Sequence, residues 1–357
     1  PLVRSVQGAY MRSIPASAEF PVHRFVGAYR PRQEVGSPLM RVSMGCALVS
    51  AFACSYKSLE GARKGTKFVK AHRHLFCFGL GYSAQHLAAS LSPDHWRISG
   101  TVRNAEGQAA LAGRGWNVFL FNGAEPLTDA RELLANVTHI VDSIPPSSDG
   151  DPVIRHHATD IAALSELDWL GYLSTTGVYG NRDGGWVNED SDRVPTGQRG
   201  RRRVEAEDAW LDFWRHHKVP VHLFRLAGIY GRGRSALDSV RQGRAKRIIK
   251  PGQVFSRIHV DDIAAVLRSS MDRPNPGRAY NLSDDKAAPP QDVITYACEL
   301  LGADRPSEVD FEQAELSEMA RSFYQDNKRV SNTRIKEELG IRLAWPTYRE
   351  GLRGLLS

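Results

Sequence analysis

Short apolar runs alternate with segments of helical spacing from residue 74 onward. The runs are rich in β-branched and aromatic side chains, and they cover residues 75–78, 96–102, 116–121, 139–144, 170–173 and 221–226. This alternation is typical of βαβ units, in which parallel strands are joined by helices that cover the sheet. The sequence therefore predicts an α/β fold with a doubly wound parallel sheet.

Helix-end signals occur between and after these runs. Asp151 stands before a proline, in the order of an N-cap and a first helical residue. Further along, Asp261 or Asp262 is placed to cap a helix. Near the C-terminus, Ser331 is placed to cap another helix and Gly340 to end it. These residues are expected to have architectural roles.

The stretch "HLFCFGLGYSA" joins the first apolar run to a helical segment through two glycines. In such a G-x-G-x-x-A pattern, Gly79 permits a tight turn, Gly81 lets the backbone approach a pyrophosphate, and Ala84 lets the helix pack closely on the strand. Tyr82 and Ser83 open the helix, where unpaired N–H groups favour phosphate. The pattern predicts a dinucleotide-binding turn in a Rossmann-type domain; the alternative is a purely structural turn.

The end of the second apolar run indicates which dinucleotide binds. An NAD site places an acidic residue about 20 residues after the glycines, whereas an NADP site places a cation there. This run ends in "SGTVRN", so Arg103 follows Gly79 by twenty-four residues with no acid beside it. NADP is the expected cofactor, with NAD as the alternative, unless Arg103 is an ordinary solvated strand end. Ser143, at the end of the fourth run, is expected to line the nicotinamide pocket.

The net charge of +7 is concentrated at the beginning of the chain. Residues 1–70, the basic leader, carry eleven basic and three acidic side chains, which leaves 36 basic and 37 acidic residues for the rest. The nearly neutral remainder argues against nucleic-acid binding. No window approaches the ~18 apolar residues of a membrane span. We expect a cytoplasmic protein, or an organellar one if the leader is a transit peptide rather than an unstructured or wrongly translated segment.

Cysteine and histidine spacing predicts no metal site. Cys46, Cys54, Cys77 and Cys298 lack CxxC spacing, and no histidine pair has the HExxH arrangement. Four cysteines are also too few for a disulfide scaffold in a chain of this length, so a reducing compartment is expected.

Seven short motifs follow one another after residue 72. They are "GLGYSA", "GTVR", "SIPP", "LSTTGVYG", "FRLAGIYGRGR", "RIHVDDIA" and "YNLSDD". In this order the sequence resembles the extended and atypical short-chain dehydrogenase/reductases of the NAD-dependent epimerase/dehydratase superfamily. It is most similar there to atypical NAD(P)-dependent oxidoreductases of unassigned substrate. The resemblance implies an NAD(P)-binding Rossmann domain over residues 71–230, a smaller and partly interleaved substrate-binding region over residues 231–357, and a homodimer as the common assembly.

The resemblance also assigns catalytic positions, and this sequence has the usual family residue at only some of them. Family enzymes place a Ser or Thr four positions before the tyrosine of "VYG" to hydrogen-bond the reacting carbonyl, and Thr175 and Tyr179 occupy these places. Their Tyr-x-x-x-Lys pair is replaced here by Arg199 and Arg203. Arg203 can still hold a ribose hydroxyl, but a guanidinium does not release its proton near neutral pH. The proton is then exchanged either by Tyr179 or by water, although the residue at the position of Tyr179 is usually structural in the family.

Basic residues gather in the C-terminal third, in the region that forms the substrate lid of similar enzymes. Arg234 and Arg257 are expected to bind substrate. The other members of the cluster are Arg241, Arg244, Lys246, Arg247 and Lys250. Because arginine binds phosphate and carboxylate through two parallel hydrogen bonds, the resemblance implies an anionic substrate such as a phosphorylated sugar or a nucleotide sugar. The alternative is a solvated helix face.

Two functions remain compatible with the sequence. The first is an NAD(P)-dependent oxidoreductase or epimerase-like enzyme that acts on a small polar substrate, either phosphorylated or a sugar nucleotide. The second is a non-catalytic NADP-binding regulatory protein, because the tyrosine that usually exchanges the proton is missing.

Overall fold

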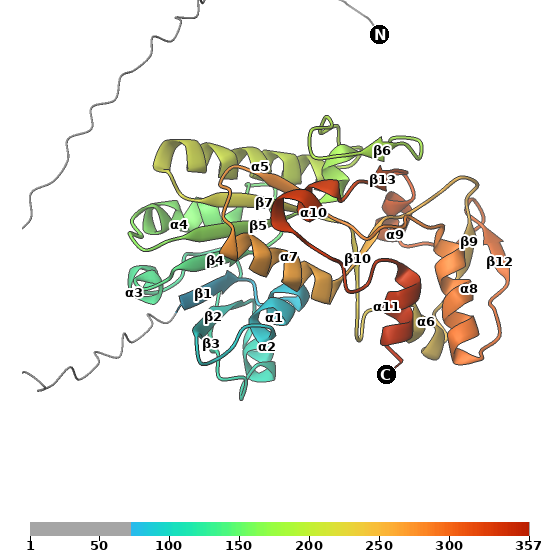
Figure 1. The fold of residues 1–357 in the computed structure, drawn as a ribbon, viewed down its shortest axis with the longest axis horizontal. Helices are drawn as coiled ribbons and strands as arrows, with labels where there is room; N and C mark the ends of the chain where they lie inside the picture. Colours follow the sequence, from blue (N-terminus) through green and yellow to red (C-terminus); the bar gives the residue numbers. More distant parts are fainter. Residues whose placement is uncertain (1–72, 357) are drawn as a thin grey trace, which may run out of the picture. The chain divides into compact units, whose positions relative to one another are not determined.

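The computed structural model describes residues 73–356 (Figure 1). The basic leader, with Cys46 and Cys54, lies outside the described residues. Within them, Cys77 and Cys298 are free and buried. No helix in residues 73–356 is long and apolar enough to cross a membrane, and no three potential metal ligands gather there.

A parallel sheet of seven strands forms the centre of the described chain (Figure 1). The strands lie in the order β11, β7, β5, β4, β1, β2, β3. Their bounds are β1 Arg73–Phe78, β2 Trp96–Val102, β3 Asn117–Leu120, β4 His139–Asp142, β5 Trp169–Thr175, β7 Val221–Leu226 and β11 Ala279–Leu282. The six apolar runs correspond to β1 to β5 and β7, so the predicted doubly wound parallel sheet is confirmed. The strand order reverses between β1 and β4, which is where such sheets bind ligands.

Alternate residues of each central strand face two separate cores. In β1, Leu75 and Cys77 belong to one core, and Phe76 and Phe78 belong to the other. The first core includes α1 (Tyr82–Ala89), α7 (Val260–Asp272) and α10 (Thr333–Leu339), and the second includes α3 (Ala130–Leu134), α4 (Pro152–Ala162) and α5 (Gln198–His217). Because both faces are covered, the strands appear in the sequence as continuous apolar runs.

The segment after β7 completes the sheet and adds a smaller core. Strand β11 pairs with β7 at the sheet edge, while α6 (Ala236–Arg241), α8 (Pro290–Leu301) and α11 (Tyr348–Gly354) surround the smaller core (Figure 1). Three short ladders join β8 (Gly228–Tyr230) to β10 (Arg257–His259), β9 (Arg247–Ile249) to β12 (Glu308–Asp310), and β6 (Trp186–Val187) to β13 (Arg329–Val330). The remaining elements are α2 (Ala105–Ala110), the 3₁₀ helix η1 (Thr176–Tyr179) and α9 (Glu318–Phe323).

Two of the predicted helix signals are confirmed. The Asp151 carboxylate accepts hydrogen bonds from the amides of Val153 and Ile154, at 2.9 and 3.1 Å, and so caps α4. Gly340 ends α10 with a φ of 66°, a left-handed conformation that favours glycine.

Two of the predicted N-caps are wrong. The N-cap of α10 is Asn332, one residue after the expected Ser331. The N-cap of α7 is His259, whose Nδ1 accepts from the Asp261 amide at 3.2 Å. Asp262 instead accepts from the amides of Ala344 and Trp345, so it fixes the segment before α11 and does not cap its own helix.

Candidate cofactor and substrate site

The glycine turn, residues 79–81, follows β1 at the point where the strand order reverses. Gly79 has a φ of 86°, and a Cβ there would lie 2.8 Å from the Ser143 Oγ. The Gly79 amide donates to the Thr101 Oγ1 at 2.9 Å, while the Ser143 hydroxyl donates to the Gly79 carbonyl at 2.7 Å. The turn is therefore held by the ends of β2 and β4. The hydroxyl proton of Ser143 is used to fix the turn, and the expectation that Ser143 lines the nicotinamide pocket stays a prediction.

The N-terminus of α1 has no side-chain cap. Gly81 is its N-cap, and its first turn holds no acidic residue. A Cβ on Gly81 would meet nothing within 4 Å, so packing within the described chain does not require glycine there. Ala84 is fully buried against the sheet, and Ser83 is buried beside it. These features fit a bound pyrophosphate, which accepts hydrogen bonds from the free amides.

Arg103 lies directly after β2 with its guanidinium free. The side chain is exposed, and it makes no hydrogen bond or ion pair with any residue from 73 to 356. The next residue, Asn104, caps α2 by accepting from the Gly107 amide at 2.9 Å, which fixes the backbone beside the arginine. The structure thus places the Arg103 cation at the end of β2, as predicted. The binding of a 2′-phosphate by Arg103 stays a prediction.

Tyr82 links the glycine turn to the substrate region. Its hydroxyl donates to the Arg232 carbonyl at 3.0 Å, and the Arg234 guanidinium lies 5.7 Å from the centre of its ring. The side chain of Tyr82 therefore supports the loop between β8 and α6, while its backbone begins α1.

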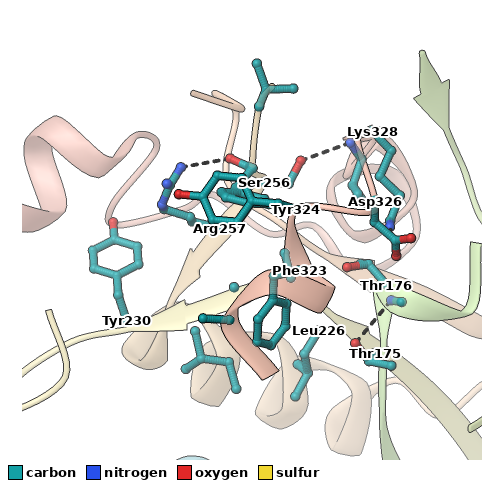
Figure 2. A pocket seen from close by; sticks show the side chains of 18 residues that line it. Thr175, Thr176, Leu226, Tyr230, Ser256, Arg257, Phe323, Tyr324, Asp326 and Lys328 are labelled. Carbon is teal, nitrogen blue, oxygen red and sulfur yellow. Dashed lines mark hydrogen bonds and ion pairs between the residues drawn. The ribbon is translucent and has the colours of Figure 1, made fainter. Parts of the chain in front are cut away.

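A cavity of about 440 Å³, which we call the threonine cavity, opens beyond the carboxyl ends of β5 and β7. Thr175 and Thr176 lie at one end of it with Asp326 and Lys328, and Tyr230 and Arg257 lie toward the other end (Figure 2). The Thr175 Oγ1 accepts from the Gly177 amide at 3.1 Å. Its hydroxyl proton remains free to donate to a carbonyl in the cavity.

Tyr179 does not reach the threonine cavity. Its side chain is fully buried, and its hydroxyl donates to the Asn281 Oδ1 at 2.7 Å and accepts from an Arg225 amino group at 2.9 Å. Burial raises the pKa of its phenol above the ordinary value. The expectation that Tyr179 is catalytic is therefore wrong, because the hydroxyl is enclosed and already bonded.

The two arginines that replace the family Tyr-x-x-x-Lys pair occupy different surroundings. Arg203 donates to the Tyr172 hydroxyl at 3.0 Å and to the Leu173 carbonyl at 2.6 Å, so its cation is fixed beside β5. Its use in holding a ribose hydroxyl stays a prediction. Arg199 is exposed, and its guanidinium lies 5.7 Å from the centre of the Phe323 ring, which lines the threonine cavity.

A second cavity, of about 500 Å³, is lined by cations, and we call it the cationic cavity. Arg234, Arg244, Lys246 and Arg257 line it, and Arg257 also lines the threonine cavity. Arg257 donates to the carbonyls of residues 255 and 288 at 2.8 and 3.1 Å, which fixes it between the two cavities. The structure thus brings both expected substrate arginines to one cavity. Arg241 and Arg247 do not line it. Arg241 pairs with Asp238, the one acidic residue among those that line the cavity, and Arg247 pairs with Glu308 outside it.

Sequence analysis missed the residues that reach the threonine cavity from the end of the chain. Asp326 and Lys328 lie just over 150 residues after Thr175, and no spacing rule connects them with it. It also missed a buried ion pair in which Arg225 contacts Glu207 at 2.8 Å. Neither side chain belongs to a motif whose spacing would have indicated its partner.

The described fold matches known enzymes over most of its length. No protein-family profile matches the chain. A dTDP-glucose 4,6-dehydratase from Bacillus anthracis, solved in complex with NAD, matches with a TM-score of 0.63 and 16% identity, over 80% of this chain and 96% of that one. The chain therefore has the same Rossmann-type fold as this dehydratase, and the resemblance is confirmed at the level of the fold.

Two other proteins are similar to this chain in sequence. A functionally unknown conserved protein from Silicibacter pomeroyi is 51% identical, with a TM-score of 0.72, over 79% of this chain and 98% of that one. Protein YeeZ of Escherichia coli K12 is 27% identical over 286 residues, which are 75% of this chain and 94% of YeeZ. The chain belongs to the same family as the Silicibacter pomeroyi protein.

Proposed function

We propose that the protein is an NADP-dependent oxidoreductase that acts on a carbonyl group of a small anionic substrate. The observation that carries this proposal is the pairing of the open glycine turn with the free Arg103 on the neighbouring strand. Amides at the N-terminus of α1 suit a pyrophosphate, and an unpaired guanidinium at that strand end suits a 2′-phosphate.

The threonine cavity supports a carbonyl as the reacting group. NADPH, when bound, supplies the hydride. Thr175 donates a hydrogen bond to the carbonyl oxygen, which stabilises the negative charge that develops there during the transfer. Arg203, fixed beside β5, is placed to hold the cofactor ribose at the same edge of the sheet.

The cationic cavity supports an anionic substrate. Arg234, in the loop between β8 and α6, and Arg257, in β10, both line it, and neither has a carboxylate partner at ion-pair distance among residues 73–356. A phosphorylated sugar or a nucleotide sugar would satisfy these cations. The dTDP-glucose substrate of the Bacillus anthracis neighbour supports the same chemical class.

A non-catalytic NADP-binding role is the second candidate. The observation in its favour is that the family tyrosine is replaced by Arg199 and that Tyr179 is enclosed. In this case cofactor binding would alter the binding of a partner and no substrate would turn over.

Turnover distinguishes the two candidates. NADPH oxidation is measured over a panel of carbonyl compounds and sugar nucleotides, with the Thr175→Val variant and a Thr175→Ser control that keeps the hydroxyl. The enzyme proposal expects at least one substrate, a loss of about 10²–10³ in kcat for Thr175→Val, and retention of most activity in Thr175→Ser. NADPH binding without turnover on the whole panel would favour the regulatory role.

A further inference from the structure

The proposed reaction needs a proton that neither sequence candidate supplies. When hydride adds to a carbonyl carbon, the oxygen becomes negative and must be protonated. Arg199 does not release a proton near neutral pH, and the hydroxyl of Tyr179 is fully bonded inside the core. The Thr175 hydroxyl stabilises the charge but is too weak an acid to neutralise it. A group with an exchangeable proton must therefore lie elsewhere in the threonine cavity.

Lys328 is the cation that lies at the Thr175 end of this cavity. It directly precedes β13, it lines the cavity with Thr175 and Thr176, and only 8% of its surface is exposed. Its Nζ donates to the Gly180 carbonyl at 2.9 Å and lies 2.9 Å from the Asp326 Oδ2. An ammonium group has three N–H donors, so one N–H remains for a ligand after these two contacts.

The same turn holds the threonine and the lysine. Helix η1 begins after Thr175, and Gly180 is the residue that ends it. Lys328 is therefore anchored to the residue that follows η1, and Thr175, whose hydroxyl is proposed to bind the substrate carbonyl, is the residue that precedes η1. Phe323, which lies under Arg199, lines the same cavity. Arg199, at the position of the absent tyrosine, does not itself line the cavity, whereas Lys328 does.

The surroundings of Lys328 favour proton exchange. Burial lowers the pKa of its ammonium below the ordinary value; the carboxylate of Asp326 opposes this shift, and the Arg182 cation adds to it. Arg257, Tyr230 and Tyr324 are the other charged or titratable groups that line the cavity. A lysine whose pKa is lowered by burial can act as an acid and a base nearer neutral pH.

Asp326 also offers a contact for the substrate. Its Oδ1 is buried and has no hydrogen-bond partner among the described residues, although Asp326 lines the cavity. A buried carboxylate oxygen without a donor is unfavourable, so a substrate hydroxyl would satisfy it.

From this geometry we infer that Lys328 is the general acid of the reaction, an inference that rests on the proposed function. Hydride adds to the carbonyl carbon, one Nζ–H bond of Lys328 breaks, and a new O–H bond forms on the substrate. NADPH is oxidised to NADP⁺, and the carbonyl is reduced to an alcohol. The neutral amine then regains a proton from water, and in the reverse direction it accepts the alcohol proton.

The first test measures the proton equilibrium of Lys328 without any turnover. The full chain is labelled with acetic anhydride across a pH series, and the reactivity of each lysine is read by mass spectrometry. Lys328 is expected to become reactive at lower pH than Lys336, an exposed lysine 2.5 Å from Asp285. Asp326→Asn should move this midpoint to still lower pH, because it removes the carboxylate that raises the pKa. The inference would be overturned if the midpoint of Lys328 coincided with that of the surface lysines, or if Lys328 were not labelled at any pH.

The second test uses a substrate found in the turnover panel. Lys328→Arg keeps the positive charge but does not release a proton near neutral pH, so kcat should fall about 10²–10⁴-fold with little change in KM. Lys328→Gln, which keeps a donor for the Gly180 carbonyl, should lose activity equally, and Lys336→Met should match the wild type. In carbonyl reduction, kcat/KM should fall as pH rises above the Lys328 pKa, and this fall should begin at lower pH in Asp326→Asn.

The outcomes separate this inference from the proposed function. Unchanged kcat in both Lys328 variants, with NADPH binding and turnover intact, would disprove only the role of Lys328. A protein that fails to bind NADPH would disprove the proposed function itself. Circular dichroism of each variant excludes loss of fold as the cause of lost activity.

Discussion

The glycine turn and the turn after β5 lie at the same edge of the sheet, but they use their polar groups differently. At the glycine turn, the N-terminus of α1 has no side-chain cap and Arg103 has no partner in the described chain. After β5, Tyr179 is fully bonded and its neighbour Arg225 pairs with Glu207. The first region therefore leaves polar groups unpaired, whereas in the second region Tyr179 and Arg225 form a structural support beside Thr175, which lines the threonine cavity. On the proposed function, this difference is the reason why the proton donor comes from another part of the chain.

The largest expected effect comes from breaking the structural support. Arg225→Met should lower the free energy of unfolding by about 3–5 kcal/mol, because it leaves the buried Glu207 carboxylate without its main partner. Arg193→Met is the matched control, since Arg193 contacts the same carboxylate at 3.2 Å from a partly exposed position. Arg193→Met should lower the free energy of unfolding by about 1 kcal/mol or less. Urea unfolding measures both, and equal losses would contradict the assignment of Arg225 as the central residue.

The two glycines of the turn should separate stability from binding. Gly79→Ala should cost about 2–3 kcal/mol in unfolding free energy, because of its positive φ and the contact with Ser143. Gly81→Ala should leave the unfolding free energy of the ligand-free protein nearly unchanged, since its Cβ meets open space. It should nevertheless weaken NADPH binding. Calorimetry with NADPH on both variants checks this, and unweakened binding in Gly81→Ala would contradict the pyrophosphate site.

The smallest effect is expected for Tyr179. Tyr179→Phe should lower the unfolding free energy by about 1 kcal/mol, because it leaves the Asn281 side chain without a donor. The kcat measured with a turnover substrate should stay unchanged. A loss of kcat of a hundredfold or more, in a stably folded variant, would restore Tyr179 as a catalytic candidate.

The sequence predicted the features that lie within single βαβ units. The strands were found because both faces of the sheet are covered, and the glycine turn and Arg103 were found because they belong to consecutive strands. The N-cap of α10 was misplaced by one residue because Ser331 and the asparagine after it are equally suited to cap a helix. The N-cap of α7 was misplaced because histidine is not among the favoured cap residues, and because Asp262 bonds to the backbone of Ala344, a contact made only by the tertiary fold.

The residues that complete the site were beyond the reach of spacing rules. The contact between Lys328 and the Gly180 carbonyl joins positions 148 residues apart, and that between Tyr179 and Asn281 spans 102. The sequence showed that the family tyrosine was missing, yet only the fold could show that Lys328 lines the cavity with Thr175.

Titration calorimetry with NADPH and NADH, on the wild type and on Arg103→Ala, tests the central claim most directly. The account predicts that the wild type binds NADPH at least about tenfold more tightly than NADH, and that Arg103→Ala removes this preference by weakening NADPH alone. Absence of heat with both cofactors, or tighter binding of NADH by the wild type, would contradict it.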